Sequence, residues 1–212
     1  MKVIIAEKPS VAREIARVVR ATNKKEGYIE GGGYAVTWAL GHLITAAMPE
    51  AYGIKGFHKE NLPILPPVFT LIPRQIKEGK GYKADATAVA QLKVIEKLFR
   101  ECEGIIVATD AGREGELIFR FIYEYLGIPR PFDRLWISSL TDKSIKEGLA
   151  RLQSGAAYDN LYYAARARSE ADWLVGINAT QSHIHSGRAR HLLLGQGTDP
   201  DPLYGLLPFL GA

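Results

Sequence analysis

The segment Gly104–Glu116, GIIVATDAGREGE, decides the fold of this chain. Its first five residues form a short apolar run, which is typical of a strand buried inside a sheet. Asp110 follows that run, and the residues from Gly115 to Leu126 have the apolar spacing of a helix. A buried strand that leads through an acidic turn into a helix predicts an α/β fold. Because ligands bind at the carboxyl ends of parallel strands, a functional site is expected at this turn.

The same pattern occurs elsewhere in the chain. Val3–Ala6 is an apolar run followed by Glu7 and Lys8, and Pro9–Arg20 has the pattern of a helix. Further strands and helices are predicted at Tyr34–Leu40, Asp85–Arg100, Leu135–Ser138 and Asp142–Leu152. This alternation predicts a mainly parallel sheet flanked by helices. An irregular insertion is predicted at residues 48–83, with a possible strand at Val68–Ile72, and Tyr158–Val175 predicts the beginning of a helical domain.

The composition excludes some classes of protein but does not identify one. The formal net charge of the 212 residues is +4, which permits a polyanionic partner but is equally compatible with an ordinary soluble surface. The single cysteine, Cys102, excludes an intramolecular disulfide and a cysteine metal cluster. The apolar run before Glu7 is too short for a signal peptide, and no run approaches the roughly 20 apolar residues of a membrane span. We therefore expect a cytoplasmic protein with no membrane partner.

Three carboxylates are expected to meet at one edge of the sheet. Asp110 and Glu114 are four residues apart around the turn, and Glu7 ends the first strand. Converging carboxylates repel one another unless a cation lies between them, and oxygen ligands of this kind suit Mg²⁺. The simpler interpretation is that acids near a helix N-terminus are favoured by the helix dipole, and for Glu116 the two interpretations are equally good.

Two basic residues near the acids, Lys8 and Arg113, are candidates for phosphate contacts. Lys8 is adjacent to Glu7, and Arg113 lies inside the acidic run, where it either balances charge or reaches a phosphate. Arg168 and Asp172, four residues apart in the predicted long helix, have the spacing of an ordinary surface ion pair, which is worth little.

Four segments together resemble the type IA DNA topoisomerases of the topoisomerase III group, in order over residues 1–181. They are MKVIIAEKPSVAREIA at the N-terminus, GHL at Gly41–Leu43, ATDAGREGELIFR at Ala108–Arg120 and ARARSEADWLVGINATQ at Ala165–Gln181. The resemblance implies a Toprim domain at residues 1–153, the start of a helical domain at 154–181 and a divergent tail at 182–212. It also implies Mg²⁺ and single-stranded or underwound DNA as ligands, with no nucleotide cofactor.

The resemblance gives each candidate residue a role. It makes Glu7 the general acid and base for the 3′ oxygen, Asp110 and Glu114 the cation ligands together with Glu7, and Lys8 a contact to the scissile phosphate. Arg168 would help to position that phosphate. Position 112 departs from the D-x-D-x-E pattern of the family, because Gly112 stands where an aspartate is usual. Glu116 would then compensate, or the cation would be bound more weakly.

The family cuts DNA through a tyrosine that belongs to a later domain. None of the ten tyrosines here lies in a matching segment, so this chain is expected to be an N-terminal fragment that is inactive alone. After Gln181 the sequence changes character. The segment Gly195–Leu203 can be encoded so that a one-base shift spells GRVQTPTL, which resembles the family's continuation. We therefore hypothesise a frameshift near Gln181, which sequencing of the encoding DNA would test.

Two other functions stay open at this point. A Toprim nuclease or primase would use the same acids without a tyrosine, although the segment from Ala165 to Gln181 counts against it. A non-catalytic DNA-binding module would bind DNA without Mg²⁺ and without needing Glu7. A Rossmann nucleotide-binding domain is the rival at the level of the fold, but no G-x-G-x-x-G follows the first strand.

Overall fold

The computed structural model describes residues 1–56, 58–79 and 81–185. The chain divides into two compact units. Unit 1 contains Met1–Thr45 and Leu71–Ala165, and unit 2 contains Ala46–Thr70 and the chain from Arg166 onward. The segment from Ala46 to Thr70, most of which lies in the insertion predicted at residues 48–83, therefore leaves the first unit and contributes to the second.

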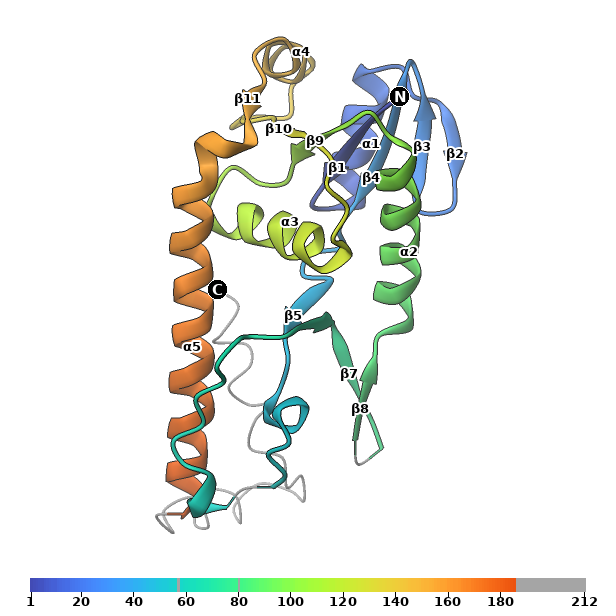
Figure 1. The fold of residues 1–212 in the computed structure, drawn as a ribbon. Helices are drawn as coiled ribbons and strands as arrows, with labels where there is room; N and C mark the ends of the chain where they lie inside the picture. Colours follow the sequence, from blue (N-terminus) through green and yellow to red (C-terminus); the bar gives the residue numbers. More distant parts are fainter. Residues whose placement is uncertain (57, 80, 186–212) are drawn as a thin grey trace. The chain divides into compact units, whose positions relative to one another are not determined.

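Unit 1 is built on a seven-stranded sheet with the order β11-β10-β9-β1-β4-β3-β2 (Figure 1). β1 pairs in parallel with β4 and β9, and β9 pairs in parallel with β10, so the centre of the sheet is parallel. The outer strands β2, β3 and β11 pair antiparallel. The strands are β1 (Lys2–Ala6), β2 (Asn23–Lys25), β3 (Tyr28–Gly31), β4 (Tyr34–Trp38), β9 (Gly104–Ala108), β10 (Phe132–Arg134) and β11 (Gln153–Ser154).

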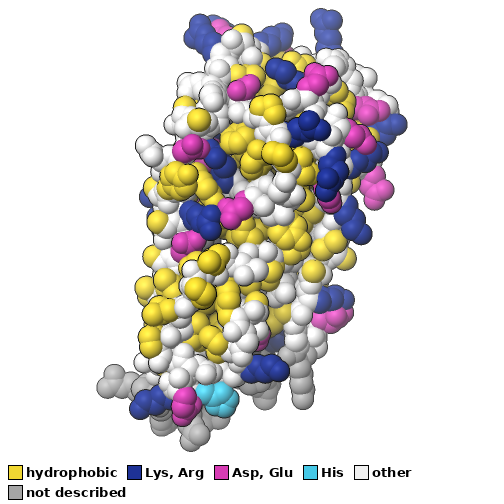
Figure 2. All heavy atoms as spheres, in the orientation of Figure 1, with side chains coloured by type: hydrophobic (Ala, Val, Ile, Leu, Met, Phe, Trp, Pro, Cys, Tyr) yellow, Lys and Arg dark blue, Asp and Glu magenta, His cyan; other side chains and the backbone are white. Residues whose placement is uncertain are grey.

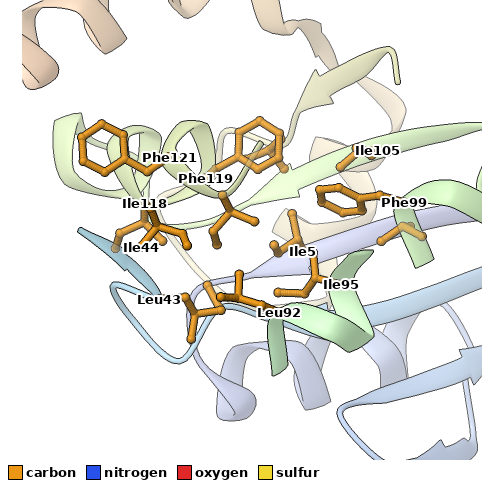
Figure 3. Packing of buried hydrophobic residues seen from close by; sticks show 14 of the residues in the cluster. Ile5, Leu43, Ile44, Leu92, Ile95, Phe99, Ile105, Ile118, Phe119 and Phe121 are labelled. Carbon is orange, nitrogen blue, oxygen red and sulfur yellow. The ribbon is translucent and has the colours of Figure 1, made fainter. Parts of the chain in front are cut away.

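Helices cover both faces of this sheet. Successive side chains of β1 point to opposite faces, and those on both faces are buried and apolar. Val3 and Ile5 point to the face covered by α2 (Ala86–Glu101) and α3 (Arg113–Leu126). Ile4 and Ala6 point to the opposite face, which α1 (Pro9–Val18) and α4 (Asp142–Ala150) cover. Figure 3 shows the first of these cores, in which Ile5 lies among side chains of α2, α3 and β9. The predicted α/β fold with a mainly parallel sheet is confirmed.

The remaining strands form two sheets of two strands each. β5 (Ile44–Ala46) pairs with β6 (Leu71–Pro73), and β7 (Gln75–Glu78) forms an antiparallel hairpin with β8 (Gly81–Ala84). The strand predicted at Val68–Ile72 therefore begins later, at Leu71. Single turns of 3₁₀ helix occur at Pro49–Tyr52, Lys59–Asn61 and Gly155–Tyr158.

Unit 2 contains most of α5 (Asp159–His185), which extends well beyond the predicted Tyr158–Val175. The indole of Trp173 donates a hydrogen bond to the carbonyl of Ala47 over 3.1 Å. Asn178 binds the backbone of Ile64 at both ends, accepting from its N–H at 2.7 Å and donating to its carbonyl at 3.0 Å. These contacts attach the inserted segment to the helix.

One predicted strand is wrong. Leu135–Ser138 is not a strand, and β10 instead covers Phe132–Arg134. Arg134 is buried at the end of that strand, where a sequence pattern would place an apolar residue. No helix in the described ranges has the length and apolarity needed to cross a membrane. Most of the tail to which the frameshift hypothesis applies, residues 186–212, lies outside the described residues.

Candidate active site

The carboxyl ends of β1 and β9 bring Glu7 and Asp110 together. The two strands pair in parallel with Ala6 opposite Ala108, so the residues that follow them leave the sheet side by side. The backbone N–H of Asp110 donates a hydrogen bond of 3.4 Å to Oε2 of Glu7. Glu7 is buried, whereas the side chain of Asp110 is 61% exposed. The predicted convergence of these two acids is therefore present in the structure.

Lys8 lies between the two carboxylates. Its ammonium nitrogen is 3.6 Å from Oε1 of Glu7 and 3.9 Å from Oδ2 of Asp110. The Lys8 side chain is 59% exposed, so the cation can also contact a ligand that approaches from solvent. One positive charge therefore offsets part of the repulsion between the two acids, and the three groups together keep a net charge of −1.

Glu114 lies in the first turn of α3 and pairs with the imidazole of His42 through Oε1 and Nε2. His42 follows β4, the strand beside β1. The partner of Glu114 therefore comes from the connection between β4 and β5. Glu114 is exposed and remains accessible to solvent. Arg113, the first residue of α3, is also exposed.

Gly112, where the resemblance leads to the expectation of an aspartate, lies in extended backbone with φ 176°. Any amino acid adopts this conformation, and a Cβ built at Gly112 meets no atom within 4 Å. The position is therefore an open space in the acidic turn, and neither steric crowding nor backbone geometry demands glycine there.

Glu116 does not compensate for Gly112, because its carboxylate is fully buried and used elsewhere. Oε1 accepts a hydrogen bond of 2.8 Å from Nε of Arg120, and Oε2 accepts one of 3.1 Å from Nε of Arg134. A buried carboxylate bound by two guanidinium groups has both oxygens engaged. Its role is in the interior of unit 1.

Arg134 is a functional candidate that sequence reasoning missed. Its guanidinium donates to three backbone carbonyls that lead into the acidic turn, those of Val107 (3.0 Å), Thr109 (2.8 Å) and Asp110 (2.7 Å). Burial lowers the pKa of Arg134, and the charge of Glu116 opposes that effect. Nothing in the spacing of the DRLW segment distinguishes this arginine from a surface residue, so only the three-dimensional contacts reveal it.

Arg168 and Asp172 belong to unit 2, on α5. Nε of Arg168 lies 3.6 Å from Oδ2 of Asp172, with the side chains 56% and 42% exposed. An exposed pair of this type contributes between zero and about 1 kcal/mol to stability. The geometry within unit 2 is that of a surface ion pair whose arginine is accessible to a ligand.

The donors of the site are of the right chemistry for a hard divalent cation, since Glu7, Asp110 and Glu114 all offer carboxylate oxygens. In the described part of the chain, no three His, Cys, Asp or Glu side chains are already grouped as a metal site. Lys8 instead lies between two of these acids. Figure 2 shows, on the face that it draws, Lys and Arg side chains beside Asp and Glu side chains.

The fold and the acidic turn define a class of protein. A family model described as the Toprim domain matches residues 2–140, which include the central strands of the sheet and every acidic residue of the site. The chain belongs to the Toprim domain family.

Curated relatives narrow the comparison. The chain is 49% identical over 182 residues to the DNA topoisomerase 3 of Bacillus subtilis, and 53% identical over 183 residues to that of Bacillus anthracis. Both matches cover 85% of this chain and 24% of the relative, so the chain spans about a quarter of their length. The resemblance to the topoisomerase III group that the sequence predicted is confirmed.

A solved structure has the same fold. The full-length topoisomerase I of Thermotoga maritima superimposes with a TM-score of 0.55 over 84% of this chain and 25% of that protein. The two sequences are 20% identical.

Proposed function

We propose that this chain is the N-terminal, Toprim-containing part of a type IA DNA topoisomerase of the topoisomerase III kind. The intact enzyme would break one strand of underwound DNA, pass another strand through the break and rejoin it. The observation that carries the proposal is the position of Lys8 between Glu7 and Asp110 at the shared carboxyl edge of β1 and β9. The identity of about half to relatives named DNA topoisomerase 3 supports it.

Within this proposal Glu7 handles a proton. It is the buried member of the acidic pair, and burial beside a lysine keeps its carboxylate in one place. A positioned carboxyl group can, when protonated, donate its proton to the leaving 3′ oxygen during cleavage, and the resulting carboxylate can accept the proton again during rejoining. The exposed ammonium of Lys8 would contact the scissile phosphate, and Arg113, exposed at the start of α3, would contact DNA nearby.

Asp110 and Glu114, together with Glu7, would hold Mg²⁺, which would neutralise charge on the phosphate. Glu7 and Asp110 already lie side by side at the ends of β1 and β9, while Glu114 is paired with His42 and would join them when the cation binds. Lys8 would then leave the Asp110 carboxylate, its present neighbour, and bind the phosphate. With Gly112 in place of a fourth acid, we expect a weak site that is completed by substrate oxygens and water.

The remaining parts of the proposal concern the rest of the chain. Residues 1–153 would form the Toprim domain with the inserted segment, and 154–181 would begin the helical domain, from which Arg168 positions the phosphate. Residues 182–212 would be a frameshifted tail, and the matches to relatives leave part of this chain uncovered, since they cover 85% of it. The phosphotyrosine would come from a domain outside this chain. Single-stranded DNA as substrate, the absence of a nucleotide cofactor and a cytoplasmic location follow from the same proposal.

A chimera tests the function. Residues 1–181 would replace the matching N-terminal part of the Bacillus subtilis DNA topoisomerase 3, and relaxation of negatively supercoiled DNA would be measured with Mg²⁺. We expect relaxation by the chimera and a loss of at least about 100-fold for Glu7→Gln, because a general acid or base contributes about 10²–10⁴-fold. Glu101→Gln, an exposed acid at the end of α2, is the matched control and should relax DNA normally.

The outcomes separate the candidate functions. Equal activity of the chimera with and without the Glu7 carboxylate would exclude a catalytic Glu7. A chimera that binds single-stranded DNA equally well with and without Mg²⁺, but never relaxes supercoils, would favour a non-catalytic binding module. Nicking of DNA by residues 1–212 alone would favour the nuclease alternative.

A further inference from the structure

We propose that Arg134 is a positioning residue for the acidic site. From inside unit 1 it fixes the backbone between Val107 and Asp110, and so sets where the Asp110 carboxylate stands relative to Glu7 and Lys8. The inference rests on the proposed function in one respect, namely that the Asp110 carboxylate helps to bind a cation.

The hydrogen bonds of Arg134 are concentrated on the turn that carries Asp110. Nη1 donates to the carbonyls of Val107 at 3.0 Å and Thr109 at 2.8 Å, and Nη2 donates to the carbonyl of Asp110 at 2.7 Å. The carbonyls of Thr109 and Asp110 lie beyond the end of β9, in the turn that leads to α3. The carbonyl of Val107 lies within β9 and also accepts from the backbone N–H of Leu135 at 2.9 Å. The planar guanidinium is suited to this task because its donors point in fixed directions.

Arg134 is itself held in place by a second layer of contacts. Its Nε donates to Oε2 of Glu116, and the other oxygen of Glu116 accepts from Arg120. Arg120 also donates to the carbonyl of Gly155 at 2.9 Å and to Oδ1 of Asp159 at 2.6 Å. The Arg134 guanidinium is therefore held by a chain of ion pairs that starts at the buried Glu116 and ends at the half-exposed Asp159. None of Glu7, Lys8 and Asp110 belongs to this chain of contacts.

The turn is closed from the opposite side by Gly115. The hydroxyl of Thr109 donates to the carbonyl of Gly115 at 2.7 Å. A Cβ at Gly115 would lie 2.1 Å from the carbonyl oxygen of Asp110, so α3 packs directly on the backbone of Asp110. The Asp110 backbone is thus fixed on two sides, while its side chain is mostly exposed and has Lys8 as a neighbour at 3.9 Å. The position of the carboxylate depends on the backbone that Arg134 holds.

A buried ion pair alone would not support this role, because such pairs are often neutral for stability. The distinguishing feature is the target of the guanidinium. Arg130 offers a comparison within the same unit, since it also donates to two backbone carbonyls, those of Phe99 (3.1 Å) and Arg100 (2.6 Å). Those carbonyls lie at the end of α2 and not in the acidic turn. Loss of either arginine removes carbonyl contacts, but only the loss of Arg134 should disturb the site.

The experiment compares Arg134→Lys with Arg130→Lys in the 212-residue chain. Amide hydrogen exchange would be followed in peptides that cover residues 107–112 and 99–103, and Mn²⁺ affinity would be measured by titration. We expect Arg134→Lys to accelerate exchange in 107–112 and to weaken Mn²⁺ binding by about tenfold, the lower end of the usual effect of losing a residue that orients a metal ligand. Arg130→Lys should accelerate exchange in 99–103 only and leave Mn²⁺ affinity within about twofold.

Asp110→Asn separates this inference from the proposed function. If Asp110→Asn binds Mn²⁺ as tightly as the wild type, the cation role of Asp110 is wrong, yet the exchange data still decide whether Arg134 fixes the turn. Wild-type exchange in 107–112 and wild-type Mn²⁺ affinity in Arg134→Lys would overturn the inference. Should Arg134→Lys fail to fold, Glu116→Gln decides: a roughly fivefold faster exchange in 107–112 supports the role, and unchanged exchange there overturns it.

Discussion

Gly112 is the position at which a single residue sets the strength of the acidic site. Its backbone is extended and a Cβ there meets open space, so Gly112→Asp should fold normally. Added carboxylate charge tightens the binding of hard cations, and we expect Mn²⁺ affinity to rise by roughly tenfold. Gly112→Asn has nearly the same size without the charge and is the matched control. Equal affinity of the Asp and Asn variants would mean that position 112 does not face the cation.

At Gly115, close to Gly112, an added side chain is expected to destabilise the protein instead of being tolerated. Replacing a helical glycine by alanine normally stabilises a helix by about 1 kcal/mol. At Gly115 the new Cβ would lie 2.1 Å from a backbone oxygen that cannot move aside, so Gly115→Ala should destabilise unit 1 by about 1–3 kcal/mol. Urea unfolding measures the change, with Gly112→Ala as the control that should lose much less. A stabilised Gly115→Ala would show that the turn is not closed against α3.

Sequence reasoning located the acids but not the residues that hold them. Glu7, Lys8 and Asp110 follow apolar strands, so their convergence follows from the rule that parallel strands end at one edge. Arg134 and Glu116 form an ion pair inside unit 1. A buried pair of charged residues has no apolar spacing in the sequence, so the sequence pattern does not reveal it. The strand was placed too late for the same reason, because Arg134 ends β10 where an apolar residue was expected.

Among the elements, α2 depends on Asp85 at its N-terminus. The carboxylate of Asp85 accepts from the backbone N–H of Thr87 at 2.9 Å and from Nη2 of Arg74 at 2.6 Å. Arg74 in turn donates to the carbonyls of Leu40 and His42, both at 3.3 Å. Asp85→Ala therefore removes the N-terminal cap of α2 and the carboxylate partner of Arg74. We expect a loss of about 2 kcal/mol in the free energy of unfolding at pH 7.

The same residue gives a pH dependence. The hydrogen bond from Arg74 lowers the pKa of the Asp85 carboxyl below its ordinary value of 3.8. The stability that Asp85 contributes is therefore fully present above that value and is lost as the pH falls through the lowered, folded-state pKa. Urea unfolding of wild type and Asp85→Ala should converge at low pH. Thr141→Ala, which removes the uncharged cap of α4, should cost the same at every pH. A constant difference for Asp85→Ala would argue against the Arg74 pair.

At the scale of the whole molecule, the division into two units was the least predictable feature. The insertion was expected from its proline and glycine content, but its attachment to α5 depends on contacts between residues far apart. Asn178 and Ile64 are separated by 114 residues, and Trp173 and Ala47 by 126. No local pattern encodes such pairings, since each partner alone has the composition of an ordinary loop or helix. They arise when tertiary packing selects one of many possible partners.

Arg168 gives a prediction at this scale, because under the proposed function it would contact DNA phosphate. Arg168→Ala in the chimera should reduce relaxation by at least about tenfold through the loss of a charged contact to phosphate. Stability should change by less than about 1 kcal/mol, because the pair with Asp172 is exposed.

Arg100→Ala is the matched control for that loss. Arg100 forms an i,i+4 ion pair with Glu96 on α2, in which the Arg100 side chain is 62% exposed and the Glu96 side chain 40% exposed. The corresponding values are 56% for Arg168 and 42% for Asp172. Both substitutions remove one helical surface arginine of nearly equal exposure, so their unfolding free energies should agree. Relaxation should differ strongly between them. Equal relaxation by the two variants would mean that Arg168 is only a surface ion pair, and the phosphate contact would then have to come from the residues around Lys8 alone.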